Sequence, residues 1–456
     1  MTESASRQVA RFAASLRLDE VPAPVRTRAR LHILDALGAG LASNAQDYAE
    51  KCAAGVRALG SPGDCSVVGR EERLELRDAA LLNGILIHGL DFDDTHLESI
   101  IHPTATSLPV ALSLGEALDA SGADLLTAFL AGVETSIRTG GAARGGFHHV
   151  GYHATGVISH FASALTAGKL LGLDENQITA AQGIAGSTAA GIQVFLEEGA
   201  WTKRFHPGWG AVAGITAARL AQNGFKGPSR VYEGKFGLFD THLHGAEADI
   251  GYIVGGLGSE WKFGDTALKP YPVCHFIHGC ADAAIGLHGE IDWRDIVSVK
   301  AQLPEPTLHI IAEPAEAKEN AETEYEAKFS AQHVVAACLI RGGFNLPDLL
   351  PDALADERVR DLAKRVKCSP DSWTRFPEFF SGGVELTMKD GRVLHRHVPV
   401  NSGAGERAMD EAAVVAKFMA SASLAVSEDQ AREIAQAVLA LEQCPARDLM
   451  ALLRSR

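Results

Sequence analysis

The residues with the greatest potential for chemistry lie in a stretch rich in aspartate and histidine, HGLDFDDTHLESIIHP, at positions 88–103. Asp91, Asp93 and Asp94 follow the apolar run AALLNGILI, which predicts that they stand at the carboxyl end of a buried helix. Negative charges there oppose the helix dipole and repel one another, which raises some of their pKa values. One such residue would fit a solvated helix-to-loop junction. The whole set favours a functional site that includes His102, at the start of the next apolar helix.

Two later motifs add proton carriers and cations. HHVGYHATG places His153 at the expected amino terminus of a helix, where an imidazole can be held near neutrality and accept or donate a proton. WTKRFHPGWG gathers Lys203, Arg204 and His206 among aromatic residues, an arrangement suited to holding carboxylates in a partly dry pocket. Taken singly, the histidine also fits a helix cap and either cation an interface salt bridge.

A third motif, LKPYPVCHFIHGCADAA, contains Lys269, Cys274, His275 and His278. It falls at the expected junction of two domains, and ligand sites favour such clefts. We therefore expect some of its basic side chains to contact a ligand.

A metal site is the main alternative for these polar groups. His88, Asp93, Asp94 and His102 could supply nitrogen and oxygen ligands, but no H-E-x-x-H, H-x-H or EF-hand spacing occurs. DDTHLE resembles the aspartate-rich motif of magnesium-dependent isoprenoid synthases, yet the sequence has no second acidic motif. It also has neither G-x-G-x-x-G after a strand nor G-x-x-x-x-G-K-[ST]. The sequence therefore predicts no metal and no cofactor, and the mixture of acids and cations suits an anionic substrate.

Composition limits the partners of this 456-residue chain. A hydrophobic content of 46% excludes a mainly disordered protein, and a net charge of −15 without a Lys/Arg cluster works against nucleic acid and anionic membranes. Seven cysteines without a C-x-x-C pair predict neither a disulfide framework nor a thiolate zinc site, so we expect a cytoplasmic protein. The amphipathic amino terminus does not resemble a signal peptide, and no apolar run could span a membrane. A small molecule is the expected partner.

The chain is expected to be mainly α-helical, with two domains. Helical periodicity dominates both ends of the sequence. In between, Ile296–Leu303 alternates like a strand, and the Asp390-Gly391 turn within Gly382–Val400 predicts a β-hairpin. The simplest architecture is a large all-helical domain formed by both chain ends, with a smaller α+β domain inserted between them. The expected segments are 1–265 and 403–456 for the helical domain and 266–402 for the inserted domain.

In this order, the motifs resemble those of the MmgE/PrpD family, which includes 2-methylcitrate dehydratase, cis-aconitate decarboxylase and iminodisuccinate epimerase. The likeness covers nearly the whole chain: DFDDTH followed by HP, GYHATGVISHFASALTAGKLLGL, TKRFHPGWGAVAGITAARLAQNGFKGP with VYEGKFGLF, KPYPVCHFIHG and EAKFSAQHVVAA. The resemblance implies a large all-helical domain, an inserted lid domain, a homodimer and an active site in the cleft.

Matched motif by motif, the resemblance also implies which residues form the pocket. Those expected to be catalytic are Asp91, Thr95, His102, His153, Lys203 and His278. Those expected to contact the substrate are Arg204, His206, Lys269, His275 and His333.

Reactions of the named relatives create negative charge beside a carboxylate or remove a group from beside one, so they need a proton carrier and cations. We expect His153 and His102 to act as acid and base, and Asp91 to orient an imidazole or a substrate hydroxyl. Thr95 would donate a hydrogen bond, and Lys203 with the adjacent arginine would clamp a carboxylate.

The prediction is a cofactor-independent lyase of dehydratase or decarboxylase type that acts on a small di- or tricarboxylate, such as 2-methylcitrate or cis-aconitate. An epimerase or racemase of an iminodisuccinate-like dicarboxylate would use the same pocket, because it differs only in returning the proton to the other face. A non-catalytic protein that retains the fold is the third alternative.

Overall fold

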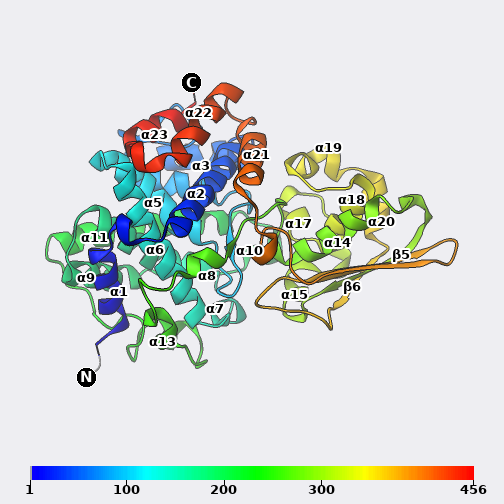
Figure 1. The fold of residues 1–456 in the computed structure, drawn as a ribbon, viewed down its shortest axis with the longest axis horizontal. Helices are drawn as coiled ribbons and strands as arrows, with labels where there is room; N and C mark the ends of the chain where they lie inside the picture. The colour runs from blue at the N-terminus through cyan, green and yellow to red at the C-terminus, as the bar shows by residue number, and fades with distance from the viewer. Residues whose placement is uncertain (1–2, 456) are drawn as a thin grey trace. The chain divides into compact units, whose positions relative to one another are not determined.

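The protein is mainly helical and forms two compact units (Figure 1). In the computed structural model, which describes residues 3–455, helix accounts for 58% and strand for 9% of the chain. Both chain ends contribute to unit 1. The sequence predicted domain boundaries at 265/266 and 402/403, whereas in the structure the chain passes between the units at 266/267 and 409/410. Unit 1 contains Met1–Phe195, Trp201–Thr266 and Asp410–Arg456, and unit 2 contains Leu196–Ala200 and Ala267–Met409.

Unit 1 consists mostly of helices packed through small residues. Its helices are α1 (Ala5–Ser15), α2 (Ala23–Ser43), α3 (Asp47–Arg57), α4 (Leu76–Ile87), α5 (Pro103–Leu118), α6 (Gly122–Ala142), α7 (Gly146–His149), α8 (Ala154–Leu170), α9 (Glu175–Gly186), α11 (Thr202–Gln222), α12 (Leu238–His242), α13 (Ile250–Val254), α21 (Glu411–Ala422), α22 (Glu428–Leu439) and α23 (Ala446–Leu453). A Cβ atom on Gly210 or Gly214 of α11 would collide with the backbone or side chain of Ser159 or Ser163 of α8. These glycines therefore allow α8 and α11 to lie in close contact.

The carboxyl-terminal helices pack against the amino-terminal ones. Helix α21 contacts α2, and the red and blue ribbons of these two helices lie side by side in Figure 1. The ammonium group of Lys417 in α21 lies 2.7 Å from Oδ1 of Asp35 in α2, and both side chains are buried. Among the described residues, no helix is both long and apolar enough to cross a membrane.

Unit 1 is not purely helical, which corrects the expected all-helical domain. Strands β1 (Pro62–Ser66) and β2 (Arg73–Leu74) pair antiparallel, with Ser66 opposite Arg73. The sequence PGDCS has no apolar alternation to reveal a strand. Gly63 approaches the backbone of Leu74 so closely that a Cβ atom there would collide with it.

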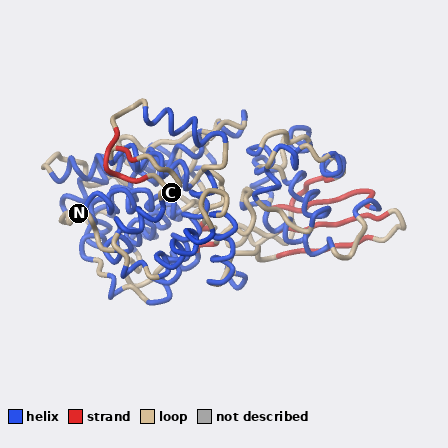
Figure 2. Tube along the Cα trace, turned by 90° about the horizontal axis from the view of Figure 1, so that it is seen from above, coloured by secondary structure: helices blue, strands red, loops and turns tan. Residues whose placement is uncertain are grey.

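Unit 2 contains a four-stranded mixed sheet in the order β6-β5-β7-β8, drawn in red in Figure 2. Strand β5 (Ile296–Leu303) runs parallel to β6 (Val366–Pro370) and antiparallel to β7 (Gly382–Met388), which pairs with β8 (Val393–Val398). The predicted strand and hairpin are thus confirmed, and Gly391 in the turn has a φ of 86°, which suits glycine.

The sheet of unit 2 is accompanied by helices, two of which carry the predicted residues His278 and His333. Helix α14 packs on β7 and β8, and α18 packs on α14 and α20. The helices are α14 (His278–His288), α15 (Leu308–Ile311), α16 (Ala315–Glu319), α17 (Glu324–Lys328), α18 (Ala331–Arg341), α19 (Pro351–Leu354) and α20 (Glu357–Ala363).

Candidate active site

The candidate site of unit 1 is assembled at helix ends. Helix α4 ends at Ile87, so His88 follows it directly, and His102 and His153 are the residues that precede α5 and α8. Lys203 lies in the first turn of α11. Because α8 packs on α5 and α11, and α11 packs on α4, these ends meet in one region.

An ion pair joins two of the predicted catalytic residues. Nζ of Lys203 lies 2.6 Å from Oδ2 of Asp91, and the two side chains are 10% and 5% exposed. The other oxygen of Asp91, Oδ1, lies 3.6 Å from Nε2 of His102. Asp91 has a φ of 52°, in the left-handed region that aspartate tolerates better than most residues. This backbone turn directs the carboxylate between a cation and an imidazole.

His102 is oriented by the backbone. Its Nδ1 lies 2.8 Å from the carbonyl oxygen of Asp94. Since a carbonyl only accepts hydrogen bonds, Nδ1 carries the proton of the neutral ring, and the lone pair is on Nε2. The hydroxyl of Thr95 lies 3.5 Å from the same Nδ1, so Thr95 stands beside this ring.

His88 forms a buried pair with Asp93. Its Nδ1 lies 2.8 Å from Oδ2 of Asp93, and both side chains are fully buried. A carboxylate at Nδ1 places the lone pair of the neutral ring on Nε2. Within the described chain, Nε2 of His88 has no hydrogen-bond partner.

His153 pairs with His206, a predicted substrate-contacting residue in α11. The Nδ1 atoms of His153 and His206 are 3.0 Å apart, so one ring donates and the other accepts. Burial holds the pKa of His153 well below its usual range, and the charges of His206 and Lys203 add to this effect. Burial likewise lowers the pKa of His206 to about 4. Both rings are therefore neutral near pH 7, and a neutral imidazole is suited to accept a proton.

A second layer of polar residues supports this cluster. Oδ2 of Asp94 accepts a hydrogen bond from the hydroxyl of Thr104 at 2.6 Å and lies 2.6 Å from Nδ1 of His32. Burial raises the pKa of Asp94 to about 7, and the charge of Asp93 acts in the same direction. Burial also raises the pKa of Asp35, the partner of Lys417, to about 6. These carboxyl groups are therefore partly protonated near neutral pH.

The second cation of the predicted clamp lies on an aromatic ring. The guanidinium carbon of Arg204 is 3.8 Å from the ring centre of Tyr48. Its neighbour Lys203 pairs with Asp91. The two basic residues thus have different surroundings, although they are adjacent in the chain.

The remaining predicted residues belong to unit 2, where all of them are buried. Nε2 of His275 accepts a hydrogen bond from the side-chain amide of Asn401 at 2.8 Å, and its ring centre lies 4.3 Å from that of His278. Lys269 is buried in the same unit. His333 lies in the first turn of α18, where its backbone N–H donates to Ser330, and burial lowers its pKa to about 4. His333 packs edge-on against Phe344.

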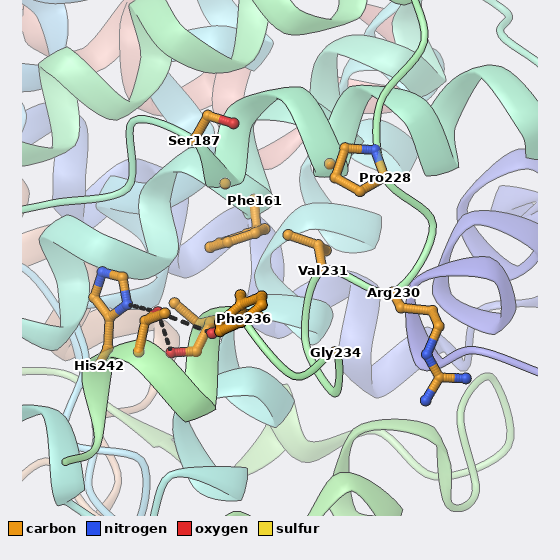
Figure 3. A pocket seen from close by; sticks show the side chains of 13 residues that line it. Phe161, Ser187, Pro228, Arg230, Val231, Gly234, Phe236 and His242 are labelled. Carbon is orange, nitrogen blue, oxygen red and sulfur yellow. Dashed lines mark hydrogen bonds between the residues drawn. The ribbon is translucent and has the colours of Figure 1, made fainter.

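Unit 1 also contains a cavity of about 340 Å³ (Figure 3). Its walls come from α8, which contributes Phe161, from α9 and α12, and from the loop before α12, and none of the predicted site residues lines it. His242 lies at its edge with Nδ1 2.7 Å from the Thr241 hydroxyl and Nε2 3.2 Å from the carbonyl oxygen of Ala189. The cavity therefore offers a mainly apolar wall and no group poised for proton transfer.

Two sets of three side chains among the described residues have the spacing to hold a metal ion. One is His88, His102 and His153, and the other is Asp91, Asp93 and His102. In each set, one ligand atom per residue lies within 4.8 Å of the others.

Comparison with known proteins identifies the family. A profile of the MmgE/PrpD N-terminal domain matches residues 7–251, and one of the MmgE/PrpD C-terminal domain matches residues 271–443. The chain belongs to the MmgE/PrpD family.

Curated relatives of this MmgE/PrpD protein match over nearly their whole length. It is 27% identical to a cis-aconitate decarboxylase-like protein of Aspergillus oryzae, with 95% of this chain and 94% of the relative covered. It is 27% identical to the cis-aconitate decarboxylase of Aspergillus terreus, with 96% and 93% covered. The human cis-aconitate decarboxylase is 28% identical, with 97% and 92% covered.

In this MmgE/PrpD chain, the structure brings together five of the predicted catalytic residues in unit 1, Asp91, Thr95, His102, His153 and Lys203, together with His206. His88 and Asp93 were considered from the sequence as alternative metal ligands but were not included among the predicted catalytic or substrate-contacting residues, although their spacing within the opening motif was visible. The sequence contains no signal for His32, which lies 62 positions before its partner Asp94. Asn401 was also missed, 126 positions from His275.

Proposed function

We propose that this protein is a cofactor-independent lyase that acts on a small di- or tricarboxylate, such as 2-methylcitrate or cis-aconitate. The observation that carries the proposal is the meeting, in unit 1, of neutral His153, of His102 and of the Lys203–Asp91 pair. These groups supply a proton acceptor, a proton donor and a cation within one buried cluster. The names of the relatives support a carboxylate substrate.

In a dehydration, the first step assigned to these residues is removal of a proton beside a carboxylate. His153 accepts the proton, because its ring is neutral near pH 7. Negative charge then develops on the adjacent carboxylate as an enediolate. Lys203, which has three N–H donors, donates one hydrogen bond to Asp91 and can direct another to this charge.

The step assigned to His102 depends on the reaction type. In a dehydration, the electron pair of the carbanion expels hydroxide, and His102 protonates it to water. A decarboxylation has no preceding proton removal: the carbon–carbon bond breaks, carbon dioxide leaves, the electron pair stays on the carbon, and His102 donates a proton to that carbon. Asp91, whose Oδ1 lies 3.6 Å from Nε2 of His102, is placed to orient this imidazole for either transfer.

Epimerisation is the second candidate function. Burial keeps the ring of His153 neutral and so able to accept a proton, a step that a dehydratase and an epimerase share. If His102 returns a proton to the opposite face of the same carbon, the product is the epimer and no group is lost. The two functions therefore differ in the substrate and in the side from which His102 acts.

The proposal extends to features implied by the family resemblance. A homodimer and a cytoplasmic location are proposed, the latter supported by seven cysteines that are all free thiols. Lys269, His275, His278 and His333 stay predictions of residues that contact substrate. The inserted unit stays a predicted lid.

Proton NMR in deuterated water tests the proposal. The purified chain is mixed with citrate, 2-methylcitrate, cis-aconitate, tartrate or iminodisuccinate, and deuterium incorporation, elimination and loss of carbon dioxide are followed. We expect turnover of one acid, reduced about 100-fold or more in Lys203→Ala, because a preorganised charge on the transition state is lost. Lys51→Ala is the control, since Lys51 pairs with Asp47 on the surface. Equal rates in wild type and Lys203→Ala would contradict the assignment of Lys203.

A further inference from the structure

Three imidazoles in unit 1 face one another in a way that the proposed reaction does not by itself require. The ring centre of His88 lies 4.8 Å from that of His102 and 5.6 Å from that of His153, and the latter two are 6.3 Å apart. One nitrogen from each ring lies within 4.8 Å of the other two. All three residues come from different helix ends, so tertiary packing creates the arrangement.

Each ring is held at Nδ1, and Nε2 of His102 also lies 3.6 Å from Oδ1 of Asp91. His88 is held by the carboxylate of Asp93, His102 by the carbonyl of Asp94, and His153 by His206. Histidine ligands of metal ions usually donate the second ring N–H to a carboxylate or a carbonyl, which fixes the tautomer and the orientation. His88 and His102 meet this condition. Within the described chain, Nε2 of His88 and Nε2 of His153 are buried and have no hydrogen-bond partner.

The dimensions of the cluster suit a tetrahedral ion. With a zinc–nitrogen distance of about 2.0 Å, rings that share one tetrahedral ion through Nε2 have centres roughly 5 Å apart. The three observed distances, 4.8, 5.6 and 6.3 Å, lie near that value. The ligand nitrogens of such an ion are about 3.3 Å apart, so small rotations of the rings would bring atoms now within 4.8 Å to their ligand positions.

The charges around the cluster favour a cation. The carboxylates of Asp91 and Asp93 lie 3.6 and 3.7 Å from the nitrogens of His102. Lys203 is the cation beside them, and its charge is paired with Asp91. Imidazole nitrogens with nearby carboxylates suit zinc, cobalt, nickel and copper better than magnesium or calcium, which prefer oxygen ligands.

We propose that His88, His102 and His153 form a binding site for one divalent ion of the zinc class, and that the bound ion inhibits the enzyme. The inhibition rests on the proposed function, because the ion occupies the lone pairs that would otherwise carry the substrate proton. The binding does not rest on it, since the three rings and their Nδ1 partners are sufficient to hold the ion.

Binding is tested on the full chain without substrate. The protein is stripped with a chelator, then titrated with Zn²⁺ in competition with a chromophoric chelator, and in parallel with Co²⁺. We expect one ion per chain and the visible absorption bands of tetrahedral Co²⁺. His88→Ala should weaken Zn²⁺ binding by at least tenfold, and Asp93→Asn by about 10- to 100-fold, because the latter removes the partner that orients the ligand. His149→Ala, at an exposed histidine of the same unit, should bind as wild type does.

The same samples test the inhibition. A second variant at position 88 controls for misfolding in the binding titration. His88→Gln, checked by circular dichroism, replaces His88→Ala if the smaller side chain prevents folding. No saturable binding, octahedral Co²⁺ bands, or equal affinity in the His88 variants would overturn the site. If the protein turns over one of the acids, one equivalent of Zn²⁺ should reduce the rate at least tenfold and a chelator should restore it. A rate that rises with Zn²⁺ would overturn the inhibition, and the binding titration alone would then decide the site.

Discussion

Lys203 and Asp91, 112 residues apart in the sequence, form a 2.6 Å ion pair in which both side chains are nearly buried. A buried pair of this kind contributes little to stability as a pair, because removing two charges from water offsets their attraction. Removing one partner is costly, because the other charge is then left in a medium of low polarity. The effect of Lys203 on stability can therefore be distinguished from its effect on catalysis by comparing single and double substitutions of the pair.

This separation predicts different outcomes for single and double substitutions. Lys203→Met should lower the free energy of unfolding by about 3–5 kcal/mol, because the Asp91 carboxylate loses its cation. Lys203→Met combined with Asp91→Asn should recover most of that stability, because neither position of the pair then carries a charge. The double variant should stay inactive, because no ammonium group contacts the substrate. Urea unfolding and NMR turnover of both variants measure the two effects. A double variant as unstable as Lys203→Met would argue against an electrostatic origin of the loss.

Stability should fall as the solution is acidified through the range of the buried histidines. Burial lowers the pKa of His206 to about 4, whereas an imidazole of the unfolded chain takes up its proton near pH 6.5. Between these values the unfolded state binds more protons, so the stability contributed by neutral His206 is present above pH 6.5 and is lost as the pH falls toward 4. The loss is up to about 3 kcal/mol for this ring.

The measurement is urea unfolding at a series of pH values for wild type and His206→Gln. We expect the glutamine variant to lose less stability on acidification, because its amide does not titrate. Asp94 and Asp35 act in the opposite direction, since their raised pKa values, about 7 and about 6, favour the folded state at low pH. Identical pH profiles for the two proteins would contradict the role of His206.

Local patterns in the sequence were sufficient for part of the fold. The Asp390-Gly391 turn predicted the β7–β8 hairpin, because a glycine with positive φ and alternating neighbours is a signal contained within a few residues. Strand β1 was missed, because its short, irregular pairing with β2 depends on the close approach of Gly63 to Leu74 and not on an alternation of apolar residues. Contacts of that kind depend on the finished tertiary structure.

In the candidate site, too, pairings between near neighbours in the sequence could be predicted, whereas pairings that depend on tertiary packing could not. The pairing of His88 with Asp93 spans five positions and could have been read from HGLDFDD. The 3.0 Å pairing of His153 with His206 depends on α8 and α11 packing closely, which the motifs of each helix do not contain. A resemblance to a family supplies that information, because the order of the motifs reflects the common fold.

Thr104 is predicted to act as a positioning residue through Asp94. Its hydroxyl donates to Oδ2 of Asp94 at 2.6 Å, and this hydrogen bond favours the charged carboxylate. Thr104→Val should raise the pKa of Asp94 further and cost about 1–3 kcal/mol of stability, because a buried acceptor loses its donor. Thr106→Val is the matched control in α5, since the hydrogen-bond partners of the Thr106 hydroxyl, the Pro103 carbonyl and the Ser107 hydroxyl, belong to its own helix. If Asp94 positions the site, the pH–rate profile should shift for Thr104→Val and not for Thr106→Val.

Close packing of α4 on α11 is predicted to be essential for bringing His88 and Lys203 to the same site. A Cβ atom on Gly208 of α11 would collide with the carbonyl oxygen of Leu81 in α4, which is backbone and cannot rotate away. Gly208→Ala should therefore destabilise unit 1 by several kcal/mol or separate the two helices, with loss of activity in either case. Gly55→Ala is the control: Gly55 lies within α3, where an added Cβ would meet no atom within 4 Å, so the variant should gain about 0.5–1 kcal/mol from helix propensity. Thermal unfolding and NMR turnover measure both variants, and a Gly208→Ala protein as stable and active as wild type would show that close packing of these two helices is not required.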